Sequence, residues 1–211
     1  MTSRSDEHIG FDKEYPLPKP GDTLLKYSGK KTLYTQSLTG NWTVYTDAYK
    51  QAADMLIDGI EGYPHEDALY CPIIFLYRHF VELTLKPIAR AIERLSGQPI
   101  PKVAGKRADS RHSILDLWLY IERNIRYLGC EIGRQTIDLL AQLVEEISRL
   151  DPDSMHTRYA HNRKGAKMHI PVDSLDIENL KDVIVKMHNA LEILTTAIDL
   201  EDEWRSEQES W

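Results

Sequence analysis

The segment Leu69–Leu95 constrains the fold more than any other part of the chain, because it is almost wholly apolar. Its central part is interrupted by one line of charged residues, Arg78, Glu82 and Lys86, which are spaced four residues apart. In an α-helix this spacing places them on one face, with the carboxylate between two cations. A helix this apolar belongs at the buried centre of a bundle, where charged groups must be paired or line a cavity that admits water.

Four other segments have the periodicity of amphipathic helices, and no segment shows the sustained alternation that a β-sheet requires. Their expected core positions, spaced three or four residues apart, are Trp42, Tyr45, Tyr49, Ala52, Leu56 and Ile60; Ile114, Trp118, Ile121, Ile125 and Leu128; Ile137, Leu140, Val144 and Ile147; and Leu180, Ile184, Met187, Leu191, Leu194 and Ile198. We therefore predict an all-α fold, an antiparallel bundle of four to five main helices.

The ends of the chain differ in composition from this bundle. Residues 1–38 are rich in proline, glycine and charge, and we interpret them as a polar N-terminal extension in which residues 23–36 form a small hairpin. Residues 39–204 form the predicted bundle, and residues 205–211 form an acidic C-terminal tail. Within the bundle, Pro87 is expected to bend the central helix directly after Lys86, and Asp173 or Ser174 is expected to cap the last helix.

Charge is unevenly distributed along the chain. The net charge of −7 argues against a nucleic-acid binder when taken as a sum. Residues 154–172, however, contain no acid and hold four Lys or Arg and three His, and a second basic loop covers residues 102–111. The first residues are polar, no apolar run is long enough for a membrane span, and Cys71 and Cys130 form no metal or disulfide motif. These features favour a cytoplasmic protein.

The charged stripe on the central helix has two interpretations. In the functional one, Glu82 orients Arg78 and Lys86, and these two cations bind a phosphate of the substrate. In the structural one, the three residues form an ion-pair ladder that fixes how neighbouring helices dock. His112, at the start of the next helix, is a further substrate-binding candidate, because a helix N-terminus favours its neutral form. It could equally be a helix residue that packs over Trp118.

The acid-free loop combines imidazoles with guanidinium groups. RNA cleavage without a metal needs this combination, because a base or acid must act on the 2′-hydroxyl and the leaving oxygen while a cation stabilises the phosphate. The catalytic candidates are Arg158, His161, Arg163 and His169, with Tyr159 and Lys164 as substrate-binding residues. The other interpretation is a solvated basic loop. We expect no metal and no cofactor, since the histidines lack close ligand spacing and no acid lies among them.

Three short motifs, taken in order, resemble the HEPN superfamily (higher eukaryote and prokaryote nucleotide-binding domain). They are residues 76–86 (LYRHFVELTLK), 112–118 (HSILDLW) and 157–159 (TRY), and the resemblance covers about residues 41–200. It implies a helical bundle, commonly dimeric, with an acidic residue followed four positions later by a basic one on an inner helix. The proline that commonly follows Arg-Tyr in this family is replaced here by Ala160.

The resemblance also implies an activity. Catalytic members are metal-independent ribonucleases that use an arginine followed, after four to six residues, by a histidine, and they act as toxins and in antiviral defence. Arg163 with His169 and Arg107 with His112 fit this spacing, whereas Arg158 with His161 does not. Other members bind nucleotide or RNA without cleavage, or pair with a nucleotidyltransferase antitoxin. The resemblance thus implies a dimer that binds or cleaves RNA, with a non-catalytic nucleotide- or partner-binding bundle as the alternative.

Overall fold

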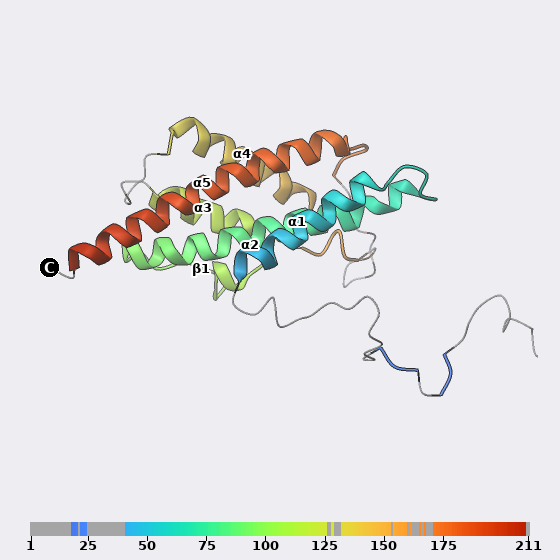
Figure 1. The fold of residues 1–211 in the computed structure, drawn as a ribbon, viewed down its shortest axis with the longest axis horizontal. Coiled ribbons are helices and arrows are strands. Elements are labelled where there is room, and N and C mark those ends of the chain that lie inside the picture. Colours follow the sequence, from blue (N-terminus) through green and yellow to red (C-terminus); the bar gives the residue numbers. More distant parts are fainter. Residues whose placement is uncertain are drawn as a thin grey trace, which may run out of the picture. The chain divides into compact units, whose positions relative to one another are not determined.

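A computed structural model shows that the chain folds as an all-α helical bundle (Figure 1). It describes residues 18–20, 22–24, 41–125, 128, 132–152, 154–159, 161, 165, 167 and 171–209. Five long helices are described: α1 (Trp42–Asp58), α2 (Tyr70–Ser96), α3 (Ile114–Ile125), α4 (Arg134–Leu150) and α5 (Ile177–Glu209). Short elements connect them: η3 (Glu66–Leu69), β1 (Lys102–Val103), β2 (Lys106–Arg107) and η4 (Ala108–Ser110). The predicted fold class is confirmed.

The chain divides into two units, residues 1–39 and 40–211, close to the predicted boundary of the extension. Most of the first unit, including most of the hairpin predicted over residues 23–36, lies outside the described residues. The five helices all belong to the second unit. The last of them continues to Glu209, so it takes in much of the segment expected to form an acidic tail.

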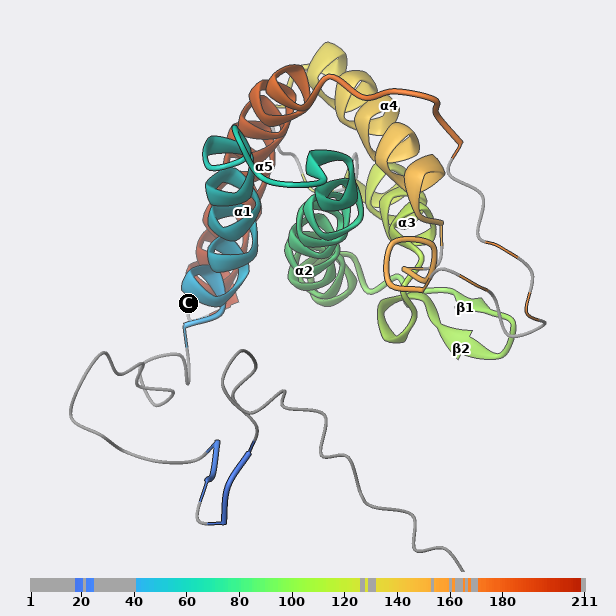
Figure 2. The same cartoon turned by 90° about the vertical axis from the view of Figure 1, so that its right-hand side faces the viewer.

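Helix α2 is the centre of the bundle. Figure 2 shows it between α1 and α5 on one side and α3 and α4 on the other, and it contacts all four. Its buried residues include Ile73, Tyr77, Phe80 and Leu85, which join the expected faces of α3, α4 and α5 in one core. A helix surrounded on most sides needs the continuous apolar sequence that segment 69–95 has.

Pro87 lies inside α2, which nevertheless continues to Ser96. A proline at this position has no N–H to donate to the carbonyl of Leu83, four residues earlier. The indole Nε1 of Trp42, from α1, donates to that carbonyl instead, at 3.0 Å. One side chain of α1 thus compensates for the hydrogen bond that α2 lacks.

Helix α1 begins as predicted, with the Asn41 side chain accepting from the N–H of Val44 at 3.1 Å. Its most buried residues are Thr46, Ala53 and Ile57, a face displaced from the expected one. Small residues there let α1 approach α2 closely, and the aromatic residue Trp42 at the start of the helix remains 47% exposed. The apolar periodicity located the helix correctly, and the expected residues Tyr49, Leu56 and Ile60 pack against the core while partly buried. The fully buried positions lie one residue further along the helix than the expected ones.

Helix α5 begins at Ile177, and the expectation that Asp173 or Ser174 caps it is wrong. The N–H of Asn179 donates to the Asp176 carboxylate at 3.0 Å, so Asp176 is the capping residue. The expected core positions from Ile184 to Ile198 are buried.

By length and composition alone, one described segment is apolar enough to cross a membrane, Glu66–Ser96, with a mean hydropathy of 1.2. It contains the central helix, and 56% of its most apolar window is buried inside the bundle. The central helix of a soluble bundle satisfies the same criterion.

Candidate functional site

Glu82 is the centre of a buried network of charged groups. Its side chain is 1% exposed, and it accepts hydrogen bonds from Arg78 Nη1 at 2.9 Å and from Lys86 Nζ at 2.7 Å. Both ion pairs expected from the four-residue spacing are therefore present. Lys86 differs from the other two, because its side chain keeps 16% exposure at the outer end of the stripe.

The ionisation state of Glu82 follows from these contacts. Burial by itself would raise the pKa of the carboxyl, but the hydrogen bond and charge of Lys86, together with His112 and Arg78, outweigh burial and hold the pKa below its ordinary value. Glu82 is consequently a carboxylate at neutral pH, and each hydrogen-bonding group around it must be a donor.

His112 is the third partner of this carboxylate. Its Nδ1 lies 3.0 Å from Glu82 Oε1 and 3.3 Å from Oε2. Because the carboxylate can only accept, the hydrogen lies on Nδ1, and in the neutral ring Nε2 is the basic nitrogen. The side chain is 57% exposed, so Nε2 is open to solvent. This arrangement, an exposed imidazole oriented by a buried carboxylate, is one that catalytic histidines use.

The turn before α3 fixes the position of His112. The Ser113 side chain accepts from the N–H of Asp116 at 3.3 Å, which caps the helix. The main-chain carbonyl of His112 accepts from Arg78 Nη2. The residue is thereby held to α2 by its backbone and by its ring.

Arg78 is completely buried, and its guanidinium donates hydrogen bonds to protein groups. Besides Glu82 and the His112 carbonyl, it donates from Nε to the Asp151 carbonyl at 2.6 Å and from Nη2 to the Pro152 carbonyl at 3.5 Å. Arg78 therefore joins α2, the start of α3 and the chain after α4. Its contacts are those of a positioning residue, which leaves the partly buried Lys86 and the exposed His112 as the groups of the network that solvent reaches.

Asp151 organises the start of the acid-free loop, a role that our sequence analysis missed. Its buried carboxylate accepts from the N–H groups of Met155 at 2.8 Å, His156 at 3.0 Å and Thr157 at 3.4 Å, and also from the Thr157 hydroxyl. An aspartate followed by proline directly after a helix is a signal for such a turn. The loop is thus fastened next to the stripe at its first residues.

The structure places the predicted site residues of the acid-free loop in different surroundings. Arg158 donates from Nε to the Ser154 carbonyl, and its guanidinium lies over the Phe75 ring of α2, 5.7 Å from the centroid. Tyr159 is beside it and 51% exposed. His161 is exposed and forms an isolated backbone bridge with Lys167.

Three of the expected site residues, Arg163, Lys164 and His169, lie outside the described residues. The structure thus brings the stripe together with His112 and with the loop as far as Tyr159.

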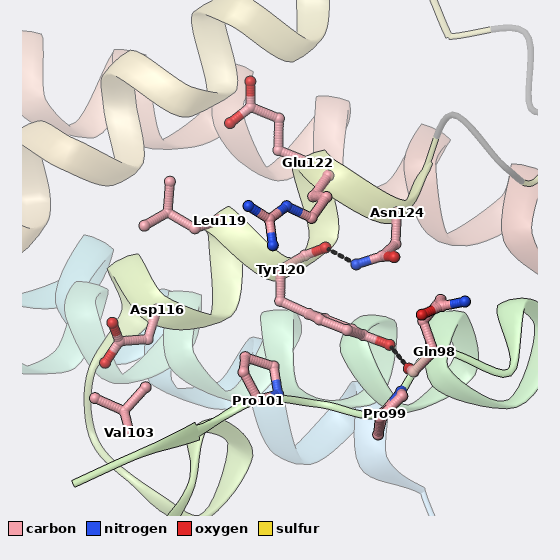
Figure 3. Close-up of a pocket in the computed structure, with 10 residues that line it drawn as sticks. Gln98, Pro99, Pro101, Val103, Asp116, Leu119, Tyr120, Glu122 and Asn124 are labelled. Carbon is pink, nitrogen blue, oxygen red and sulfur yellow. Dashed lines mark hydrogen bonds between the residues drawn. The ribbon is translucent and has the colours of Figure 1, made fainter.

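A separate cavity of about 550 Å³ lies between α3 and the segment that follows α2 (Figure 3). Figure 3 shows the hydroxyl of Tyr120 donating to the Gln98 carbonyl, at 2.6 Å, with Pro99 and Pro101 drawn below this bond. None of the expected site residues that the structure describes lines this cavity. Within the described part of the chain, no group of three His, Cys, Asp or Glu side chains is arranged to hold a metal ion.

Comparison with known proteins adds no relative: no family model, no curated protein and no solved structure matches this chain.

Proposed function

We propose that this protein binds RNA at the site around Glu82 and cleaves it without a metal ion. The observation that supports this most directly is the pair formed by Glu82 and His112, a buried carboxylate that orients an exposed imidazole. Lys86 supplies a positive charge at the same carboxylate. Acid–base chemistry on a phosphodiester needs a histidine with a free ring nitrogen and a cation for the phosphate, and these residues provide both.

In the proposed reaction, His112 Nε2 takes the proton of a 2′-hydroxyl as that oxygen bonds to phosphorus. The bond from phosphorus to the 5′-oxygen breaks, and the leaving oxygen takes up a proton. The products are a 2′,3′-cyclic phosphate and a 5′-hydroxyl end. Lys86 stabilises the charge on the phosphate that reacts, while Arg78 keeps its structural contacts. Arg158, which lies over Phe75, binds a neighbouring phosphate of the same strand.

The test is incubation of RNA with purified protein in EDTA, followed by analysis of the new ends. We expect 2′,3′-cyclic phosphates in the wild type and their loss in His112→Ala. His161→Ala and His169→Ala, tested in parallel, show whether the loop histidines supply the second proton transfer. Intact RNA at high protein concentration, or cleavage that survives all three substitutions, would contradict the proposal.

The proposal extends to the setting of the protein. The resemblance to the HEPN superfamily favours a homodimer in the cytoplasm, acting in antiviral defence or as the toxin of a pair with a nucleotidyltransferase antitoxin. Light scattering on the purified chain tests the dimer. Co-purification with a neighbouring nucleotidyltransferase tests the pair.

A non-catalytic nucleotide- or partner-binding bundle is the second candidate, and the burial of Arg78 favours it. Arg78 donates to three backbone carbonyls and one carboxylate, so much of the charged stripe stabilises the fold. For this candidate we expect ATP or GTP to raise the melting temperature while adenosine and guanosine do not. RNA would then remain uncut under the conditions of the cleavage assay.

A further inference from the structure

Beside the Glu82 site, aromatic rings from three parts of the chain form a continuous series. In order they are Trp42, Tyr45 and Tyr49 of α1, His79 and Phe75 of α2, and Tyr159 of the loop, which we call the aromatic strip. Neighbouring ring centroids within the first five are 4.5–5.9 Å apart. The Arg158 guanidinium connects the last two, 5.7 Å from the Phe75 centroid and 5.8 Å from that of Tyr159.

The two ends of the aromatic strip are open to solvent. Trp42 is 47% exposed and Tyr159 is 51% exposed, while the rings between them are half-buried. Rings that served only to pack α1 on α2 would be covered at both ends, as the core rings Phe80 and Trp118 are. The strip therefore presents ring surface to solvent at Trp42 and Tyr159.

The strip adjoins the cations of the proposed site. His79 lies on the same face of α2 as Glu82, three residues away, and Lys86 follows Glu82 by one turn. Arg158 contributes an exposed guanidinium at the other end. A strand whose phosphates contact Lys86 and Arg158 would have its bases next to the rings.

The rings are uncharged at neutral pH. Burial is the main cause that lowers the pKa of His79, and the hydrogen bond with the Tyr45 hydroxyl, followed by burial, raises the pKa of Tyr49 to about 12. Neutral aromatic faces with cations at intervals are the combination on which successive unpaired bases stack in proteins that bind single strands.

We propose that the aromatic strip is a base-stacking subsite, which holds unpaired nucleobases of the strand whose phosphate lies at Lys86. The inference rests on the proposed function, since it assumes a nucleic-acid ligand at the Glu82 site. It adds a selection rule: the ligand must have accessible base faces, so a duplex, whose bases are already stacked, is excluded. Stacking tolerates any base, so little sequence preference is expected.

The experiment compares three labelled probes by fluorescence anisotropy with the full-length protein. They are a single-stranded RNA, an abasic strand with the same number of phosphates, and a duplex. We expect the single strand to bind about tenfold more tightly than the abasic strand, the equivalent of stacking one base. Tyr159→Ala and Trp42→Ala should each weaken single-strand binding about fivefold or more and leave abasic binding unchanged.

Matched controls exist on the same chain. Tyr63→Ala removes a tyrosine that is 50% exposed, and Trp204→Ala removes a tryptophan that is 57% exposed, both outside the strip; neither should change binding. Because Trp42 also bonds to the Leu83 carbonyl, circular dichroism must show that its variant folds. The Tyr159 side chain makes no hydrogen bond to another described residue, so its variant tests the inference independently.

Two outcomes separate this inference from the proposed function. Equal affinity for the single and abasic strands, or strip variants that bind like wild type, would overturn base stacking while phosphate binding at Lys86 stands. Absence of binding to every probe would overturn the proposed function as well.

Discussion

At the scale of single residues, the charge of the Glu82 carboxylate stabilises the fold. Replacing it in Glu82→Gln leaves the fully buried Arg78 without its counter-charge, and removing one partner of a buried pair costs about 3 kcal/mol. Because the folded-state pKa of Glu82 is lowered, its stabilising contribution is present above the ordinary value of 4.5 and is lost as pH falls through the folded value. The loss caused by the substitution should therefore shrink in acid.

Urea unfolding at several pH values between about 7 and 3 measures this difference. Glu145→Gln is the control, since Glu145 pairs with Arg149 on the surface, where both side chains are more than half exposed. If Glu82→Gln lost no more stability than the control, the network would not be a determinant of the fold.

His79 gives a second pH dependence of stability, in the same direction as that of Glu82 but at higher pH. Burial, aided by the charges of Lys86, Arg78 and His112, outweighs Glu82 and lowers the pKa of His79 below its ordinary value of 6.5. Below that value the unfolded chain binds the proton more readily than the folded chain, so stability falls as the pH drops. His79→Phe keeps a ring against Tyr49 and removes the proton site, and the melting temperature should then decline less between about pH 7.5 and pH 5.5.

His65→Asn is a suitable control for this experiment, since His65 is exposed in a turn with φ of 68° that asparagine tolerates. The melting temperature of this variant should change with pH as that of the wild type does. A wild-type profile in His79→Phe would mean that His79 takes up its proton equally in the folded and unfolded chains.

The two kinds of contact around Glu82 differ in how far the sequence predicts them. The pairs with Arg78 and Lys86 follow from helix geometry, since residues four apart share a face. The contact with His112 spans 30 residues and depends on how α3 docks against α2, which periodicity does not specify. The sequence marked His112 as a binding candidate, but only the packed bundle shows its Nδ1 on the carboxylate. Asp151, whose carboxylate is bonded by backbone N–H groups and one hydroxyl of its own loop, was missed because no charge pattern marks such a turn.

At the scale of helices, the hydrogen bond from Trp42 of α1 replaces the one that Pro87 of α2 cannot donate, and this predicts the result of a double-mutant experiment. Trp42→Phe leaves the Leu83 carbonyl without a donor inside a helix that also lacks the Pro87 N–H, and should cost about 1–2 kcal/mol. In a Pro87→Ala background the restored N–H can donate to Leu83, and the same substitution should cost clearly less. Denaturant unfolding of the four proteins measures the coupling. Additive losses would show that the indole does not compensate for the proline.

Helix positions were predictable because each helix has an apolar period and a terminating signal. Gly59 and Gly97 follow the last residues of α1 and α2. The exact buried face of α1 was less predictable, because close packing selected Ala53 over larger neighbours. The cap of α5 was misjudged among three acidic or hydroxyl residues, since each of them can accept an N–H two or three residues further along the chain. The β1–β2 hairpin has two residues in each strand, too few for an alternating pattern.

At the scale of the whole molecule, the contrast between net charge and local charge predicts how RNA binding responds to salt. The chain carries −7 overall, so attraction must come from the few cations near the site and not from a global field. Each phosphate contact to a single strand contributes about −0.7 to the slope of log K against log salt. Lys86→Ala and Arg158→Ala should therefore each make the slope about 0.7 less negative.

Lys102→Ala, on the β1–β2 hairpin of the second basic loop, should leave the slope unchanged, because Lys102 lies on the loop that makes no described contact with Glu82. Anisotropy titrations of the single-stranded RNA over a range of salt concentrations give all four slopes. If Lys102→Ala changed the slope and Lys86→Ala did not, the RNA-binding surface would lie on the hairpin. This result would leave the Glu82 network with a structural role only, since a phosphate held at the hairpin would not be the one that reaches His112.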